Sequence, residues 1–308
     1  MSLRYHVVSI AAVLLALALG VVLGASALSG RVLGALTNDR DVLAGQVQAL
    51  QGDRATVGAQ LGATERLVAA GAPSTVAGVL PGRGVAVVAA PGADPGDVDA
   101  VADLITDAGG RVTGRLALTD AAVAPDQAEA LRALVPRLLP AGAQLPTTTD
   151  TGTLTGSLLG ALLTVRPGAV ADPATAPEAA TALRALADAG YVVPSEGPAP
   201  EPGELALVVA GAGADPARDA TLARLAGAID RVGAGAVLAA RTGSGAVPVV
   251  RGDPALRSGL STVDGLEGPA SRVATVLALR EQADGRTGVY GPAAGTFTPQ
   301  PAPAGPAG

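Results

Sequence analysis

Two aspartates that follow Gly-rich turns are the residues of this sequence best placed to hold a ligand. Asp94 comes after the run at residues 87–93 and Asp215 after the matching run at residues 208–214, and a proline follows each aspartate. Asp is favoured just before a helix, where its carboxylate accepts first-turn N–H groups, and Pro is favoured at the first helical position. The pattern therefore predicts two helix caps. If the preceding runs are parallel strands, both carboxylates also lie where open α/β sheets bind ligands, facing a small hydroxylated or cationic molecule.

Two further ligand-binding candidates lie in the last third of the chain. Asp264 ends a short strand predicted over residues 260–264, and Arg272 lies in the helix predicted over residues 269–282. With Asp94 and Asp215 they complete the set of candidate ligand-binding residues. No residue is a candidate for catalysis.

The residue inventory argues against most catalytic and metal chemistry. The chain has one His, one Met and no Cys, and its basic residues are all Arg. A conventional imidazole or thiolate metal site within one protomer therefore lacks its ligands. A Ser-His-Asp arrangement would need His6, which lies beside an apolar N-terminal segment, and a Gly-x-x-x-x-Gly-Lys phosphate loop would need a Lys. Residues 211–215 lack the third glycine of the dinucleotide fingerprint.

These absences predict a protein that is not an enzyme, with no cofactor and no metal ligands. The formal net charge of −6 also argues against nucleic acid as a partner.

The first element of the chain is an apolar N-terminal segment. Residues 7–28 consist of Val, Ile, Leu and Ala with a few Gly and Ser, between Arg4 and Arg31. As a helix this segment is ~33 Å long, enough to cross a hydrocarbon core of about 30 Å. The alternative is a cleaved secretory signal ending near residues 25–27, but such signals have apolar regions of about 7–15 residues. We therefore favour a retained membrane anchor, a single span, within residues 1–30.

Charges at the two ends of the anchor predict its orientation. Arg4, the terminal amine and His6 precede it, whereas the charges of residues 31–41 nearly cancel. Because positive flanks stay in the cytoplasm, the rest of the chain is expected outside, in the cell membrane or envelope.

A heptad pattern follows the anchor over residues 31–72. Apolar side chains occupy most of two seam positions in 3,4 alternation, which favours a coiled coil and a homo-oligomer, a parallel dimer or a higher oligomer. Arg40 and Arg54 lie at seam positions, where polar residues weaken a coiled coil but restrict its register. The alternative is a lone amphipathic helix lying on the globular domain; in either case residues 71–73 are expected to end the helix. The seam residues are Leu33, Arg40, Val47, Arg54, Leu61 and Val68 at one position and Leu36, Leu43, Leu50, Val57 and Thr64 at the other.

Residues 81–291 alternate between strand and helix patterns, which is typical of an α/β domain. Residues 87–95 and 208–216 are identical at all but two positions. The repeat indicates two related half-units in one doubly wound, mostly parallel, Rossmann-like sheet flanked by helices. Residues 292–308, rich in Pro, Ala and Gly, are expected to form a disordered tail. Helices are predicted over residues 95–108, 126–139, 153–163, 178–189, 220–232 and 269–282.

Several blocks of the sequence carry a family resemblance. Together with the heptad helix and the α/β body, they resemble the actinobacterial copper transporter family over most of the chain. The resemblance implies a cell-envelope protein of copper homeostasis that helps to remove copper, placed in an outer membrane as a channel, with copper ions as its cargo. It assigns no metal ligands. The blocks are residues 2–9, residues 16–24, residues 261–264, residues 272–279 and the pair Tyr290-Gly291.

The single span and the helix-covered sheet limit how such a protein could act. A single spanning helix cannot line a pore, and a sheet covered by helices is not a membrane barrel. Two hypotheses therefore remain: a component of copper efflux, and a non-enzymatic, oligomeric envelope scaffold or ligand-sensing module.

Overall fold

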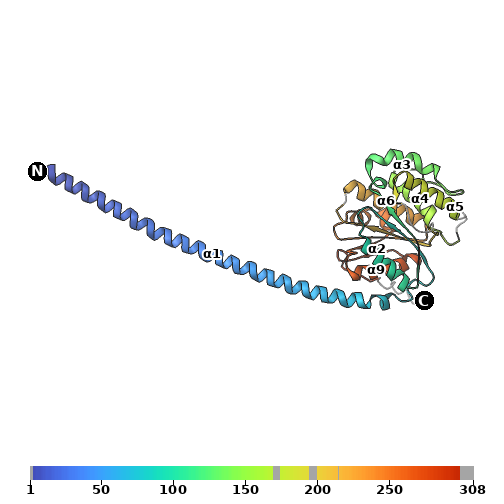
Figure 1. The fold of residues 1–308 in the computed structure, drawn as a ribbon, viewed down its shortest axis with the longest axis horizontal. Helices are drawn as coiled ribbons and strands as arrows, with labels where there is room; N and C mark the ends of the chain where they lie inside the picture. The colour runs from blue at the N-terminus through green and yellow to red at the C-terminus, as the bar shows by residue number, and fades with distance from the viewer. Residues whose placement is uncertain (1–2, 169–173, 194–199, 214, 299–308) are drawn as a thin grey trace, which may run out of the picture. The chain divides into compact units, whose positions relative to one another are not determined.

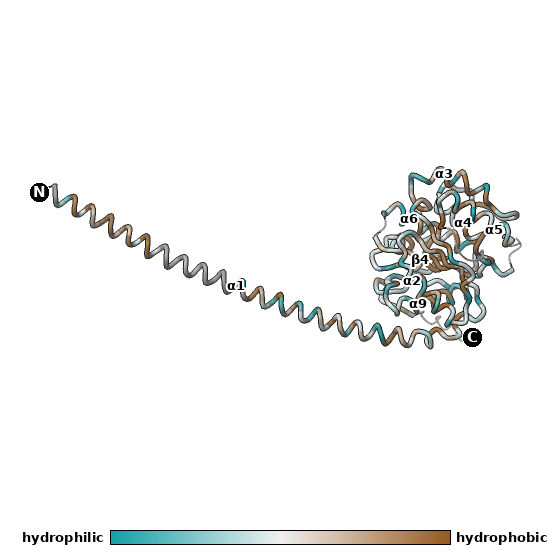
Figure 2. Tube along the Cα trace, in the orientation of Figure 1, coloured by the Kyte–Doolittle hydropathy of each residue, from teal (hydrophilic) through white to brown (hydrophobic). Residues whose placement is uncertain are grey.

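The N-terminal element is one helix, α1 (Leu3–Val76) (Figure 1). The computed structural model describes residues 3–168, 174–193, 200–213 and 215–298, with backbone only for residues 3, 4, 25–39 and 41. Within α1, Tyr5–Gly24 has a mean hydropathy of 2.8, and it is the one helix of the described chain that is long and apolar enough to cross a membrane. Figure 2 shows this segment as mostly hydrophobic. The predicted N-terminal apolar helix is confirmed.

The end of α1 differs from the prediction. The helix was expected to stop at residues 71–73, but it continues through Pro73 to Val76. Pro73 removes one backbone N–H donor from the helix, a local penalty that argues for an end at this point. The continuation buries Ala72 and Val76 against the α/β core, where they are 4% and 0% exposed. Tertiary packing therefore offsets the local effect of the proline.

The chain divides into two compact units, Met1–Thr64 and Glu65–Gly308, and the second contains a seven-stranded sheet. The strand order is β3-β2-β1-β4-β5-β6-β7, and every neighbouring pair is parallel except β2 and β3. The predicted mostly parallel sheet is thus confirmed. The strands are β1 (Gly84–Ala89), β2 (Arg111–Leu118), β3 (Val192–Val193), β4 (Leu205–Ala210), β5 (Ala236–Ala240), β6 (Ser261–Asp264) and β7 (Val289–Tyr290).

Helices cover both faces of the sheet, as the ribbon in Figure 1 shows. Successive side chains of a strand point to opposite faces, so Val85 and Val87 lie in one apolar core and Ala86 and Val88 in the other. The first core is completed by the end of α1, by α2 (Pro95–Asp107) and by α9 (Pro269–Ala283). The second is covered by α3 (Ala128–Leu134), α4 (Thr151–Leu163), α5 (Ala176–Asp188), α6 (Pro216–Val232), α7 (Ala246–Gly252) and α8 (Pro254–Arg257).

Three glycines let α4 and α6 approach each other closely. Gly152, Gly156 and Gly160 lie four residues apart, so they share one face of α4. A Cβ atom on Gly152 would lie 2.4 Å from the backbone oxygen of Thr221, and one on Gly156 would lie 2.2 Å from that of Leu225. The glycine stripe therefore fixes the separation of these two helices.

Several predicted helix boundaries need correction. The helices expected to begin at residues 153, 178 and 220 begin earlier, at the points where Asp150, Thr175 and Asp215 cap them. The helix expected over residues 126–139 is wrong as a single element. It is replaced by η2 (Pro125–Gln127), α3 and η3 (Val135–Arg137), because prolines at 125 and 136 interrupt the backbone hydrogen bonding.

The tail predicted from residue 292 also begins too early. Gly291 forms a β-bridge with Thr296, and Phe297 packs against the core. Residues 299–308 of the predicted tail, and residues 194–199 of a predicted Pro-rich loop, lie outside the described residues.

Candidate functional site

The two capping aspartates lie at the centre of the sheet. Strands β1 and β4 are neighbours, with β2 beside one and β5 beside the other, so chain order reverses direction between them. This is the switch point at which open α/β sheets bind ligands. Asp94 accepts the N–H of Gly96 at 2.8 Å, and Asp215 accepts the N–H of Ala217 at 2.9 Å. The helix-cap prediction is confirmed for both residues.

The two Gly-rich turns touch each other at this point. A Cβ atom on Gly211 would lie 2.0 Å from the carbonyl oxygen of Gly92. Backbone contact therefore closes the space between these turns. In dinucleotide-binding proteins with a doubly wound sheet, the pyrophosphate binds at this place.

A buried ion-pair cluster lies beside the first turn. Asp97, one turn into α2, is 1% exposed. Its carboxylate accepts Nε of Arg241 at 2.5 Å and Nη2 of Arg272 at 2.8 Å, and Nη2 of Arg241 lies 2.8 Å from Oδ2 of Asp94. Two predicted candidates, Asp94 and Arg272, are thus brought together by Asp97 and Arg241, which were not among the predicted residues. Their signal in the sequence was the position of Asp97 three residues after Asp94, and that of Arg241 directly after β5.

The electrostatic state of Asp97 follows from its partners. Burial raises its pKa, but hydrogen bonds from Arg241 and Arg272, together with their positive charges, outweigh burial and lower the pKa below its ordinary value. Asp97 is therefore ionised at neutral pH, and the cluster is a closed set of matched charges.

We expect Asp97→Asn to destabilise the α/β domain by roughly 3 kcal/mol, because it leaves two arginines without their shared carboxylate. Because the pKa of Asp97 is lowered on folding, its contribution is present above the ordinary Asp pKa of about 3.9 and is lost as the pH falls through the lower folded value. Thermal unfolding of both proteins from pH 7 to pH 2.5 should show the difference shrinking in acid. Asp103→Asn, at an exposed position of α2, is the matched control. A pH-independent difference would contradict the assignment.

A second ion pair lies at the equivalent positions of α6 and the segment after β2. Arg218 of α6 lies 2.6 Å from Asp120, which follows the end of β2. The same offset in numbering that relates Asp94 to Asp215 relates Asp97 to Arg218 and Asp120 to Arg241. Helix α2 thus pairs with the residue that follows β5, and helix α6 pairs with a residue that follows β2. The chain from β1 to Asp120 supplies both aspartates and the chain from β4 to Arg241 supplies both arginines, so the charges are inverted between the two pairs.

Asp264 lies apart from the other candidates. It is 14% exposed in its side chain, binds Nη2 of Arg251 at 2.6 Å, and accepts the N–H of Ala293 at 2.8 Å. Arg251 also donates to the carbonyl of Tyr290 at 2.8 Å. Asp264 therefore joins β6 to the chain segment that follows β7, and its ligand-binding role stays a prediction.

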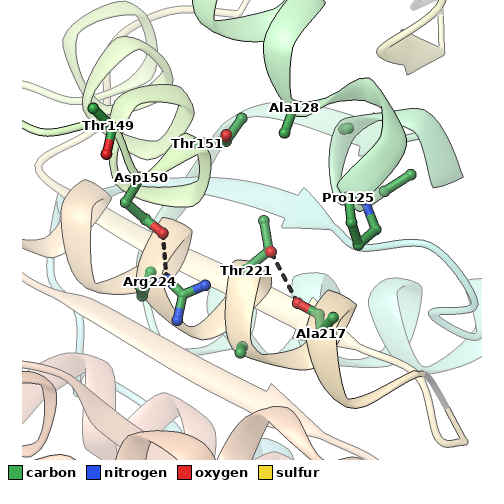
Figure 3. A pocket seen from close by; sticks show the side chains of 11 residues that line it. Pro125, Ala128, Thr149, Asp150, Thr151, Ala217, Thr221 and Arg224 are labelled. Carbon is green, nitrogen blue, oxygen red and sulfur yellow. Dashed lines mark hydrogen bonds and ion pairs between the residues drawn. The ribbon is translucent and has the colours of Figure 1, made fainter.

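One pocket with polar lining opens between α4, α6 and the segment before α3 (Figure 3). It has a volume of ≈ 270 Å³. Asp150 caps α4 through the N–H of Thr153 at 2.7 Å and pairs with Nε of Arg224 at 2.6 Å. The remaining lining is mostly Ala, Pro and Thr. The pocket therefore offers no nucleophile with an adjacent base, and its one ion pair, Asp150 with Arg224, has no net charge.

A second, more apolar pocket of ≈ 350 Å³ lies at the carboxyl ends of β1 and β2. Its charged residues, Arg115 and Asp99, are ion-paired with each other. Across the described residues, no three His, Cys, Asp or Glu side chains come together in a way that could hold a metal ion.

The fold and site define an α/β protein with a mostly parallel sheet and an ion-pair cluster beside its central strands. Among the described residues, one N-terminal helix is apolar enough to span a membrane. The chain belongs to the MctB family: the family model described as "Copper transport outer membrane protein, MctB" matches residues 1–301. This confirms the resemblance seen in the sequence blocks.

Curated relatives from several mycobacteria carry the name "Copper transporter MctB". Those of Mycobacterium bovis and Mycobacterium tuberculosis are each 34% identical to this chain over 309 residues, covering 96% of this chain and 98% of the relative. That of Mycobacterium leprae is 34% identical, covering 94% of this chain and 96% of the relative.

Proposed function

We propose that this chain is a membrane-anchored, non-enzymatic protein of the cell envelope that takes part in copper efflux. The observation that carries the proposal is the family match over residues 1–301. It is supported by relatives that are named copper transporters and that align with this chain over nearly their whole length. The apolar helix Tyr5–Gly24 supplies the anchor. The family description names an outer membrane, which we propose as the site of the anchor.

The role proposed for the chain in copper handling is indirect. Cu(I) prefers thiolate and thioether ligands, and the chain has no Cys and only Met1, with His6 as its sole imidazole. Met1 precedes the proposed span Tyr5–Gly24, and His6 lies at its N-terminal end. A single spanning helix cannot enclose a path for ions. We therefore propose that copper moves through an assembly of several chains or a partner, to which this chain contributes an anchor and a stalk.

A coiled coil is the proposed means of assembly. The seam side chains Leu43, Val47, Leu50, Val57 and Leu61 are between 53% and 67% exposed in the single chain. Pairing two helices would remove this apolar surface from water, at about 25 cal/mol per Å² buried. A parallel homodimer is the simplest assembly that does so.

We expect a strain lacking this protein to accumulate copper and to recover when the full chain is restored. Cellular copper content after growth in added copper measures the effect, with zinc content as the control metal. Normal copper together with altered envelope assembly would contradict the proposal and favour a scaffold, a role that the ion pairs of Asp94 and Asp97 with Arg241 and Arg272 also suit. Purified protein from residue 29 onward should bind Cu(I) more weakly than micromolar, ~8 kcal/mol, in competition with a chelator.

The proposed orientation places the α/β domain outside the cytoplasm. A reporter enzyme that is active only outside should be active when fused after Pro303 and inactive when fused before Ser2. The reverse result would overturn the orientation, and release of the domain into the soluble fraction would show that the helix is cleaved.

A further inference from the structure

We infer that two chains associate as a parallel, in-register dimer whose register is fixed by Asp–Arg pairs between the chains. The inference rests on the proposed coiled coil and adds to it the partner, a second copy of this chain, and the residues that align the two copies.

The observation is a repeated pair of charges on the seam. Asp39-Arg40 and Asp53-Arg54 place an arginine at the first seam position of a heptad and an aspartate just before it. The two pairs are separated by a whole number of heptads, so both lie on the same face of α1.

Neither member of the second pair has an intrahelical ion-pair partner. Residues three and four positions away from Arg54 are Leu50, Gln51, Val57 and Gly58, none of them acidic, and no basic residue lies at these spacings from Asp53. Both side chains are exposed on α1. The sequence around Asp39 and Arg40 has the same property: neither has an oppositely charged residue three or four positions away. Within the described part of one chain, Asp53 and Arg54 are therefore available to pair with another molecule.

A parallel dimer pairs them. Each seam residue of a coiled coil fits into a hole made by four residues of the facing helix. For Arg54 in an in-register parallel dimer, these four are Leu50, Asp53, Arg54 and Val57 of the second copy. The aspartate then offsets the repulsion between the two guanidinium groups. The same holds for Arg40 with Asp39 of the second copy.

Other arrangements lose these pairs. A stagger of one heptad sets Arg54 beside Gln46 or Gln60 in place of an aspartate. A stagger of two heptads lets Arg40 of one copy meet Asp53 of the other. It leaves Asp53 and Arg54 of the first copy, and Asp39 and Arg40 of the second, without partners. Antiparallel pairing would send the two N-terminal segments Tyr5–Gly24 in opposite directions, which helices anchored in the same membrane cannot do.

Single cysteines test orientation and register, because the chain has none of its own. The full-length chain is placed in phospholipid vesicles and mildly oxidised. Leu50→Cys and Leu43→Cys should each form disulfide-linked dimers, whereas Gln48→Cys, off the seam, should not. Mixing the two seam variants should give links only between like positions. Links between positions 43 and 50, or none at either seam position while the chain remains dimeric by mass, would overturn the in-register dimer.

Charge exchange tests the Asp–Arg pairs. In the Leu50→Cys chain diluted with lipid, Asp53→Arg and Arg54→Asp should each lower linked dimer formation, raising the dimer dissociation constant about 10-fold through the loss of two pairs and new repulsion. Combining both substitutions should restore it. Normal cross-linking in all three variants would refute the charge pairs while leaving the proposed coiled coil intact, whereas a chain that is monomeric without any substitution would refute both.

Discussion

The full-length chain in which Leu43 and Leu50 are both replaced by aspartate is expected to be monomeric. These side chains are 60% and 67% exposed in the single chain, and they lie at the same seam position in successive heptads. A dimer would have to bury two carboxylates per chain in an apolar seam, at several kcal/mol for each, and Arg40 and Arg54, three and four residues away, offset this cost only in part. Sedimentation in a mild detergent measures the change in mass.

The matched control carries the same number of new charges at the same spacing. Gln48→Asp with Ala55→Asp places two aspartates seven residues apart on the side of α1 away from the seam. This variant should keep the mass of the unaltered chain. If the unaltered chain is already monomeric at micromolar concentration, the heptads do not form a coiled coil and the proposed assembly is wrong.

Gly156→Ala is expected to destabilise the α/β domain by about 3–4 kcal/mol, an unusually large effect for one methyl group. The added Cβ would lie 2.2 Å from the backbone oxygen of Leu225 and 2.8 Å from the Cβ of Ala228. Because the nearest atom belongs to the backbone of α6, relief requires the two helices to move apart. Chemical denaturation of the purified chain, followed by circular dichroism, measures the loss.

Gly252→Ala provides the comparison for this substitution. Gly252 also lies in a helix, α7, but beyond its chain neighbours and the backbone of α7 itself no atom lies within 4 Å of its added Cβ. Alanine is the better helix former by about 1 kcal/mol, so this change should be neutral or stabilising. Equal effects at both positions would show that close packing of α4 on α6 is not what requires glycine.

The parts of the fold that the sequence predicted are those determined by local patterns. β1, β4 and β5 are continuous apolar runs that lie almost entirely buried, as expected for central parallel strands. The Asp-Pro pairs at Asp94 and Asp215 predicted two helix starts because capping is a contact between near neighbours.

The parts that were missed depend on contacts between distant segments. Asp97 lies on a helix face where an aspartate is usually solvated, and only the fold brings Arg241 and Arg272 against it. The helix beyond Pro73 is explained by burial of Val76, which no local pattern reveals. For the same reason, the sequence predicted Asp94 and Arg272 as separate candidates without indicating that they share one cluster.

The inverted charges of these two ion pairs have a consequence for encounters between neighbouring chains during folding. If the β1–Asp120 segments of two molecules met through this interface, Asp97 would face Asp120; two β4–Arg241 segments would set Arg218 against Arg241. Both encounters place like charges in contact, one of them at a buried position. Only a β1–Asp120 segment with a β4–Arg241 segment forms both ion pairs. Homotypic mispairing between chains is therefore opposed by electrostatic repulsion, although the two halves share the same strand-turn-helix framework.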